Sequence, residues 1–206
     1  MSDPLPIPHE TASTTSADAP VRVLTDIQIE PVGELDWDEF FCYINDHRFD
    51  NGQAANGYFL PISKFEATRP YPKEDSFRSG LGVPVGSEGW RRAWVARTDR
   101  QIVGHVDLRA HPVPFAEHRC LLGMGVHRDH RRRGLGATLL AHAVLWATKN
   151  TQLEWIDLDV LTTNDSALRL YRRAGFTEVG EVAEMFRIDG QAFNLTRMAK
   201  RISSMK

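Results

Sequence analysis

The sequence predicts one α/β (α+β) domain in which a central mixed β-sheet carries helices on both faces. Segments with the alternation typical of strands and segments with the spacing of amphipathic helices follow one another along the chain. The 206 residues, 42% of them hydrophobic, suffice for one domain with a full core and are too few for two of ordinary size. We therefore expect residues 21–206 to form a single domain.

The N-terminal part of the chain divides into a tail and the start of the fold. Residues 1–20 are rich in Pro, Ser, Thr and Ala and contain hardly any large apolar side chains. Such a composition cannot offset the entropy lost on ordering, so we expect a disordered tail. Residues 21–32 alternate enough to predict a first strand, and residues 35–44 carry apolar side chains at helical spacing.

Residues 45–89 form a long segment with prolines, glycines and scattered aromatic residues but little periodicity. Only residues 62–68 favour a turn or two of helix. A connection of this length is uncommon in a domain unless it has a function. Its aromatic residues fit the wall of a binding pocket and a small satellite core beneath a loop equally well.

The middle of the chain is typical of antiparallel strands. Residues 90–96 and 101–109 predict a hairpin that turns at residues 98–100, and residues 118–126 predict a further strand.

The last third alternates between helix and strand signals. From Leu135 the apolar residues recur every four positions, as one face of an amphipathic helix requires. Residues 155–160 are rich in strand formers. Residues 177–188 and 192–199 flank Asp189-Gly190, a dipeptide favoured in tight hairpin turns.

Residues 126–136 are the most informative run, because a strand end leads through a basic, glycine-containing loop into a helix. First-turn N–H groups of a helix lack intrahelical partners and lie at the positive end of its dipole, and glycines let a ligand approach the backbone. The context favours a phosphate site over a merely solvated basic surface.

Two common phosphate loops do not fit this run. The dinucleotide fingerprint requires a glycine where Leu139 stands, and the Walker loop requires Gly-Lys-Ser/Thr where residues 136–138 stand. The pattern that fits is Arg/Gln-x-x-Gly-x-Gly/Ala after a strand, here with Arg131, Gly134 and Gly136. It resembles the pyrophosphate loop of the GNAT superfamily of acyl-CoA N-acyltransferases.

A second, independent resemblance lies downstream, behind the β-rich run 155–160. Residues 164–176 are similar to the family's Asn-x-x-Ala-x-x-Leu-Tyr-x-x-x-Gly-Phe helix. In the order of its predicted helices and strands, the chain resembles the family over residues 21–201. The branch it resembles acetylates the N-terminal amines of ribosomal proteins. The matching residues are Asn164, Ala167, Leu170, Tyr171, Gly175 and Phe176.

The resemblance implies a mostly antiparallel sheet of six to seven strands, with acetyl-CoA bound as co-substrate where two strands splay apart. The backbone of Met124 and Val126 would hold the pantetheine and the acetyl group, and Asn164 would hydrogen-bond the pantetheine arm. The loop would wrap the pyrophosphate, and Arg131 would add charge-assisted contacts. The residues expected to bind the co-substrate are Met124, Val126, Arg131, Arg132, Arg133, Gly134, Leu135, Gly136, Ala137 and Asn164.

Two residues are expected to move protons. Tyr171 would protonate the departing thiolate as general acid, and Asp159 would take up the amine proton, directly or through a water. Asp159 stands where the family's branch has a glutamate, one methylene longer, and Asp157 points to the same face of the strand. The alternatives are an ordinary buried aromatic for Tyr171 and solvated strand carboxylates for the two aspartates.

The acceptor implied by the resemblance is a primary amine, either on a small molecule or at a peptide or protein N-terminus. Its groove would be walled by residues 45–89, which form an insertion on the acceptor side, and by residues 185–194. An α-amine has a pKa near ~8, against ~10.4 for lysine, so it needs less help to become a neutral nucleophile.

Composition argues against several other classes. The net charge of −2 makes the basic run a local island, so we expect no nucleic-acid partner. Cys42 and Cys120 show no Cys-x-x-Cys spacing, and nothing fixes His118, His127 and His130 on one face with Cys120, so we expect no metal.

No apolar stretch approaches ~20 residues, and there is no basic-then-apolar leader, so we expect a cytoplasmic protein with no membrane partner. Three hypotheses remain: an N-acetyltransferase, a non-catalytic CoA-binding sensor or scaffold, and a nucleic-acid module that uses residues 128–133. The first accounts for both motifs. A monomer and a homodimer fit the sequence equally.

Overall fold

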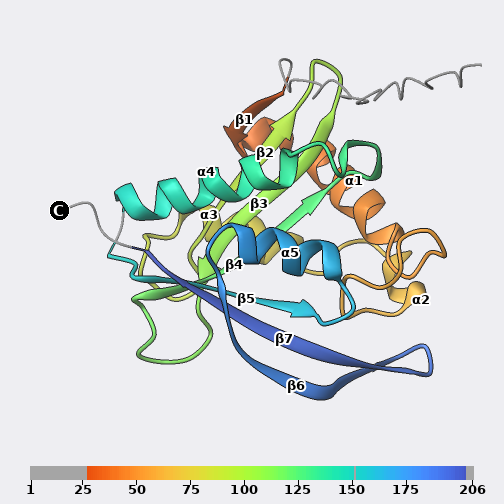
Figure 1. Cartoon of the computed structure of the whole chain (residues 1–206). Coiled ribbons are helices and arrows are strands. Elements are labelled where there is room, and N and C mark those ends of the chain that lie inside the picture. Colours follow the sequence, from red (N-terminus) through yellow and green to blue (C-terminus); the bar gives the residue numbers. More distant parts are fainter. Residues whose placement is uncertain (1–26, 151, 203–206) are drawn as a thin grey trace, which may run out of the picture.

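The structure, a computed structural model, describes residues 27–150 and 152–202. Seven strands form one sheet in the order β1-β2-β3-β4-β5-β7-β6 (Figure 1). The expected tail, residues 1–20, and the first half of the expected first strand, residues 21–26, lie outside the described residues.

The elements follow the chain in two halves. The first half comprises β1 (Gln28–Pro31), a 3-10 turn (Glu34–Asp36), α1 (Trp37–Phe49), α2 (Lys64–Ala67), α3 (Glu74–Gly82), β2 (Arg91–Arg97) and β3 (Ile102–Ala110). The second half comprises β4 (Arg119–Val126), a 3-10 turn (Arg128–His130), α4 (Leu135–Asn150), β5 (Trp155–Leu161), α5 (Asp165–Arg173), β6 (Thr177–Ile188) and β7 (Gln191–Arg201).

Most elements lie where the sequence predicts them, but α3 does not follow from the pattern. The two glycines in α3, Gly80 and Gly82, are poor helix formers and hide its periodicity. Gly80 is required by packing, because a Cβ there would lie 2.8 Å from the carbonyl oxygen of Gly89. Phe77 buries its ring and fixes α3 against the sheet.

The sheet is mixed and mostly antiparallel, as the sequence predicts. All neighbouring strands run antiparallel apart from β4 and β5, which are parallel because α4 carries the chain back between them. In the described part of the chain, none of the helices has both the length and the apolar character needed to cross a membrane.

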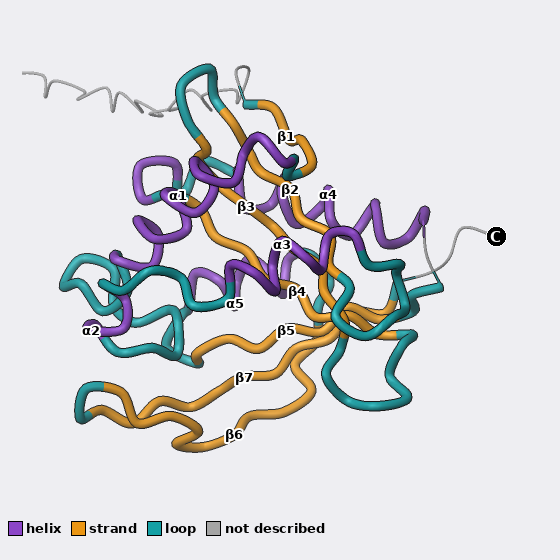
Figure 2. The backbone as a smooth tube through the Cα atoms, turned by 180° about the vertical axis from the view of Figure 1, so that it is seen from behind, coloured by secondary structure: helices purple, strands orange, loops and turns teal. Residues whose placement is uncertain are grey.

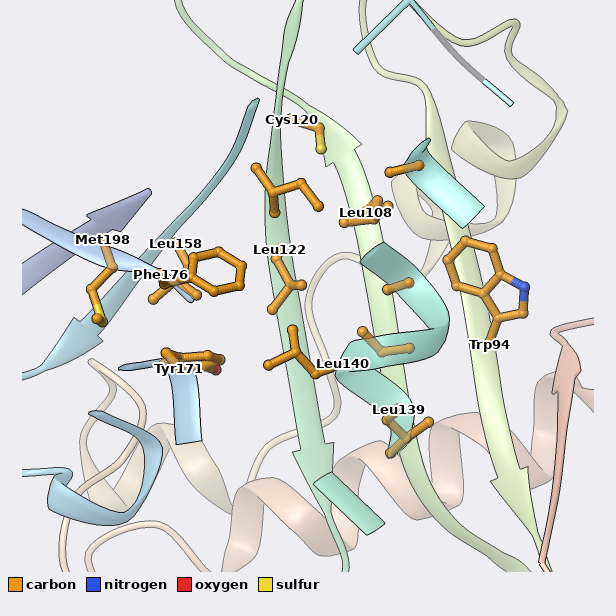
Figure 3. Packing of buried hydrophobic residues seen from close by; sticks show 14 of the residues in the cluster. Trp94, Leu108, Cys120, Leu122, Leu139, Leu140, Leu158, Tyr171, Phe176 and Met198 are labelled. Carbon is orange, nitrogen blue, oxygen red and sulfur yellow. The ribbon is translucent and has the colours of Figure 1, made fainter. Parts of the chain in front are cut away.

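The helices cover both faces of the sheet. Helices α4 and α5 lie in front of it in Figure 1, and α1 and α3 lie on the opposite face, seen from behind in Figure 2. Each face has its own apolar cluster. In the larger one Leu139 and Leu140 of α4 pack against β3 and β4, while Tyr171 and Phe176 lie beside β5 (Figure 3).

We predict that Leu139→Ala lowers the free energy of unfolding by about 2–5 kcal/mol, because it opens a cavity in a close-packed core. Leu139 is fully buried, and a Cβ on Gly104 of β3 would lie 2.9 Å from its Cδ1 atom. Urea unfolding measures the change. The matched control is Leu145→Ala on the same helix, where the side chain is 51% exposed. Equal destabilisation by both variants would contradict this packing.

Candidate active site

The two parallel strands at the centre of the sheet separate soon after they begin. Residues 119–121 of β4 pair with residues 155–157 of β5. Beyond that point β4 continues to Val126 and β5 to Leu161 with no pairing between them. β4 stays paired to β3, and β5 to β7. The facing edges of β4 and β5 therefore enclose a gap in which the backbone groups of the two strands do not pair with each other.

Met124 and Val126 direct their backbone groups into this gap. The N–H of His127 donates to the carbonyl of Val103 at 2.9 Å, and residues of an antiparallel pair alternate between bonding to the partner strand and facing away from it. In this register Gly125 bonds to β3, whereas Met124 and Val126 face β5. The sequence assigns these two residues to the thioester end of acetyl-CoA.

The loop between β4 and α4 passes twice through the left-handed region, with φ of +60° at Arg132 and +89° at Gly134. The carbonyl of Gly134 accepts the N–H groups of Ala137 and Thr138 at 2.9 and 3.1 Å, which starts the helix. The N–H groups before them have no helical partner and lie at the positive end of the dipole, as in anion sites at helix N-termini. Arg132, Arg133, Gly134 and Ala137 are exposed, Gly136 is half-buried and Leu135 is buried.

Two arginines of the basic run are bonded to partners within the protein. Arg131 donates to Asn56 Oδ1 at 2.7 Å, to Asp50 Oδ2 at 2.9 Å and to a β4 carbonyl at 2.9 Å. Arg128 donates to the other oxygen of Asp50 at 2.7 Å and to both oxygens of Asp46. These carboxylates hold the pKa of Arg128 above its usual range. The two arginines fasten the loop to the end of α1.

Asp50 is the centre of this cluster, with a side chain only 5% exposed. The sequence assigns Arg131 to the pyrophosphate, but in the structure each of its three nitrogen atoms already donates to a protein oxygen. Sequence spacing gives no sign of these partners, because Arg131 lies 81 residues from Asp50.

Tyr171 lies on α5 in the space between β4 and β5, beside Phe176 and Leu158 (Figure 3). Its ring centroid is 5.8 Å from that of Phe176. Burial raises the pKa of the phenol to about 12, so the hydroxyl keeps its proton at neutral pH. Within residues 27–150 and 152–202 this hydroxyl has no hydrogen-bond partner, which leaves it available as a donor.

The side chain of Asn164 caps α5. Its Oδ1 atom accepts the N–H of Ala167 at 3.2 Å and the hydroxyl of Ser166 at 3.0 Å. The amide nitrogen has no partner in the described part of the chain and can donate to a ligand. Asn164 also lines an open cavity of about 460 Å³. The other lining residues are Asn56, Gly57, Tyr58, Thr163, Asp165, Ser166, Arg169, Gln191 and Phe193.

Asp189 connects the C-terminal hairpin to the 45–89 segment beside this cavity. It occupies the β6–β7 turn with φ of +48°, and its Oδ2 atom accepts the hydroxyl of Tyr58 at 2.6 Å and the N–H of Lys64 at 2.9 Å. The Tyr58 ring packs on Phe193 with centroids 5.0 Å apart. Part of the long 45–89 segment is thereby held against the C-terminal hairpin.

Asp157 and Asp159 project from the face of β5 opposite to Tyr171. The alternate residues of β5 pack in the cluster that contains Tyr171, and successive strand residues point to opposite faces. The two oxygens of Asp159 accept bonds from Arg197 at 2.9 and 3.3 Å, and its side chain is 39% exposed. Asp157 is buried and accepts from Arg119 at 2.7 Å. Each carboxylate therefore has a cationic partner.

Three ring side chains gather on the same face at Gly125 of β4. The hydroxyl of Tyr43 donates to the Gly125 carbonyl at 3.0 Å, and His105 Nδ1 lies 3.1 Å from the Tyr43 oxygen. Because the phenol has one proton and gives it to the carbonyl, His105 Nδ1 must donate. His47 has no hydrogen-bond partner among the described residues, and its Nδ1 atom is fully enclosed.

Burial keeps these rings neutral at physiological pH. It lowers the pKa of His105 to about 4 and raises that of Tyr43 above its usual range. The pKa of His47 lies well below its ordinary value, first because of burial and then because of His105 and Arg131.

The sequence analysis missed this group, although a signal was present. Phe40, Tyr43, Ile44 and His47 follow the i, i+3, i+4, i+7 spacing of one helix face, and all four are buried. The pattern predicted a helix but ended it at residue 44. As for metals, residues 27–150 and 152–202 contain no group of three or more His, Cys, Asp or Glu side chains that could hold an ion.

We predict that Asp50→Asn destabilises the fold by about 1–3 kcal/mol, since it weakens two charge-assisted hydrogen bonds of a buried carboxylate. It should also raise the KM for acetyl-CoA, because the loop loses its attachment to α1. Urea unfolding and steady-state kinetics measure the two effects. Asp129→Asn, at a 74% exposed side chain, is the control and should change neither.

The buried histidines predict a loss of stability in acid. In the unfolded chain they titrate near ~6.5. Between that pH and about 4 the unfolded chain binds protons that folded His105 does not, so stability falls as the pH is lowered through this window. His105 alone accounts for a loss on the order of 3 kcal/mol.

Urea unfolding between pH 7.5 and 4.5 measures this dependence. His105→Gln should make it shallower, whereas His118→Gln, at an exposed position, should leave it unchanged. Identical slopes in all three proteins would show that His105 titrates normally in the folded state.

Comparison with known proteins agrees with this geometry. The profile of the acetyltransferase (GNAT) family matches residues 58–176, more than half of the chain. The spermidine N(1)-acetyltransferase of Vibrio cholerae serotype O1 is 24% identical over 152 residues, which are 74% of this chain and 83% of that protein. The N-alpha-acetyltransferase RimI of Mycobacterium tuberculosis is 31% identical over 107 residues, 50% of this chain and 63% of that protein.

A solved structure shares the fold. The crystal structure of an acetyltransferase of the GNAT family from Streptococcus pneumoniae superposes with a TM-score of 0.69 at 21% identity, and covers 86% of this chain and 100% of its own. The profile match runs from the 45–89 segment through both motifs to Phe176, the last residue of the second. The chain therefore belongs to the acetyltransferase (GNAT) family and is an N-acetyltransferase.

Proposed function

We propose that this enzyme transfers the acetyl group of acetyl-CoA to a primary amine, on a small molecule or at a peptide or protein N-terminus, by direct attack of the amine on the thioester. The observation that carries the proposal is the edge of β4 at Met124 and Val126, whose N–H groups face away from β3 beyond the residues paired with β5, together with the free hydroxyl group of Tyr171 in the same apolar cluster. Backbone donors and a proton source would thus serve the same thioester.

The loop before α4 fits the diphosphate of the co-substrate. It combines unpaired N–H groups, a helix dipole and the exposed guanidinium groups of Arg132 and Arg133. Because Arg131 is bonded to Asp50 and Asn56, its role in this proposal is to hold the loop in shape. The charge-assisted contacts fall to its two exposed neighbours.

Acetyl-CoA, when bound, supplies an acetyl group activated as a thioester. The N–H groups at Met124 and Val126 would orient its carbonyl, and the free amide nitrogen of Asn164 would bond to the pantetheine arm. Tyr171 would give its proton to the departing sulfur, a role for which its raised pKa of about 12 keeps it protonated. Asp159 would line the acceptor groove, with its charge matched by Arg197.

The relatives indicate which acceptors to try first. Their names record acetylation of spermidine and acetylation of an α-amine. The open cavity beside Asn164, lined by the 45–89 segment and the C-terminal hairpin, is where the acceptor would bind in this proposal.

The test is an acceptor screen with spermidine, a peptide with a free N-terminus and ethylamine, in which thiol release from acetyl-CoA is followed and the product is identified by mass. We expect Tyr171→Phe to lower kcat by about 10²-fold, because the leaving thiolate loses its proton donor. The affinity for acetyl-CoA, measured by calorimetry, should stay within about twofold. An unchanged kcat would remove Tyr171 from the mechanism.

Gly134→Glu tests the co-substrate site itself. It places a negative charge and a strained left-handed residue in the loop, so acetyl-CoA binding should be lost. Gly134→Ala introduces the strain without the charge and should retain part of the affinity. Full affinity in Gly134→Glu would show that the diphosphate binds elsewhere.

A further inference from the structure

His47 of α1 lies directly on the backbone of β4 at Gly125. A Cβ on Gly125 would be 2.5 Å from Nε2 of His47 and 2.7 Å from Cε1 of His105, so these rings fill the space over the glycine. The two neighbours of Gly125 in the strand, Met124 and Val126, are the residues that face the gap. His47 is thus one strand residue away from the backbone proposed to hold the thioester carbonyl.

Among the rings of this group, His47 is the one with no hydrogen bond to a described residue at either nitrogen. His105 and Tyr43 are bonded in series to the Gly125 carbonyl. Both nitrogens of His47 lack partners among the described residues. The residue is only 7% exposed, and its Nδ1 atom is fully enclosed. A buried polar atom without a partner costs about 1–3 kcal/mol, which is a reason to look for a ligand at this position.

The surroundings of His47 hold it in the neutral form. Tyr43 on its own helix stacks on it with ring centroids 6.1 Å apart, and His105 on β3 meets it edge to face with centroids 5.9 Å apart. The charges of Arg131, His127 and Arg128 also act on it, and the two guanidinium groups in turn pair with Asp46 and Asp50 at the end of α1. Burial and these groups keep the pKa of His47 well below its usual range, so one ring nitrogen always carries a lone pair.

His47 also lies beside the part of the chain expected to wall the acceptor groove. The ring of Phe59, from the 45–89 segment, packs on it at 5.0 Å. By contrast, Asp159 is more exposed, and both of its oxygens accept bonds from Arg197. A neutral, unpartnered imidazole next to β4 is better suited to meet an amine than a carboxylate that is already paired.

We propose that His47 is a catalytic residue that accepts a hydrogen bond from the acceptor amine and takes its proton as the amide forms. This inference rests on the proposed function. The amine nitrogen bonds to the carbonyl carbon, the carbon–sulfur bond breaks, the proton on nitrogen passes to a ring nitrogen of His47, and the sulfur receives the proton of Tyr171. Even a weak base suffices, because the nitrogen becomes positively charged and acidic once the new bond forms.

Kinetics of His47→Gln, with the fastest amine of the screen above, test the role. We expect kcat to fall by about 10²-fold, as for loss of a general base, with unchanged affinity for acetyl-CoA by calorimetry. The rate of the variant should go on rising with pH where the wild-type rate is level, since hydroxide must then take the proton. The matched control is His142→Gln, which should behave as wild type. This histidine is half-buried and packs on Trp94, on the face of the sheet opposite to His47.

Two further measurements separate chemistry from folding. Urea unfolding confirms that each variant is folded, and imidazole in solution should restore part of the rate of His47→Ala by entering the space left by the ring. In ¹⁵N spectra of histidine-labelled protein, CoA with ethylamine should shift the His47 signal and leave that of His142 in place. A wild-type protein that acetylates no amine overturns the proposed function, whereas an active wild type with an equally active His47→Gln variant overturns the role of His47 alone.

Discussion

The short pairing of β4 with β5 is the constraint on which the rest of the structure depends. Backbone N–H and C=O groups inside a protein need partners, and a sheet that stops pairing in its middle leaves several without one. Such an opening persists because β3 and β7 hold the outer edges of the two strands and α5 packs across the space between them. The sheet thereby keeps a place where a ligand can supply the missing hydrogen bonds.

The loop that follows β4 is attached to α1. Both arginines that follow β4 are bonded to carboxylates of α1, so the phosphate loop and the helix on the other face of the sheet are joined through Asp50. The same helix places His47 on β4. The part of the molecule that would bind the donor and the part that would meet the acceptor are therefore joined by an ion-pair cluster centred on the buried Asp50.

The sequence predicts the fold and the donor site better than the acceptor side. Periodicity and turn residues place the strands of the central sheet, and a local loop of fixed spacing marks the proposed phosphate site. The partners of Arg128 and Arg131 lie roughly 80 residues away along the chain, where no local pattern can identify them. Helix α3 was missed because glycine weakens its pattern. His47 shares its helix face with Phe40 and Ile44, so spacing alone shows burial and not the missing partner.

Asp189 has a consequence for how acceptor choice can change. Its carboxylate binds Tyr58 and the backbone of Lys64, so two segments that meet at the cavity share one residue. Exchanging either segment alone would break the bond between Tyr58 and Asp189 unless the incoming segment carried the same residue, whereas the bond from the Lys64 N–H needs only the same backbone position. Chimeras that exchange residues 45–89 and the C-terminal hairpin together would therefore keep the contacts of Asp189 with Tyr58 and Lys64.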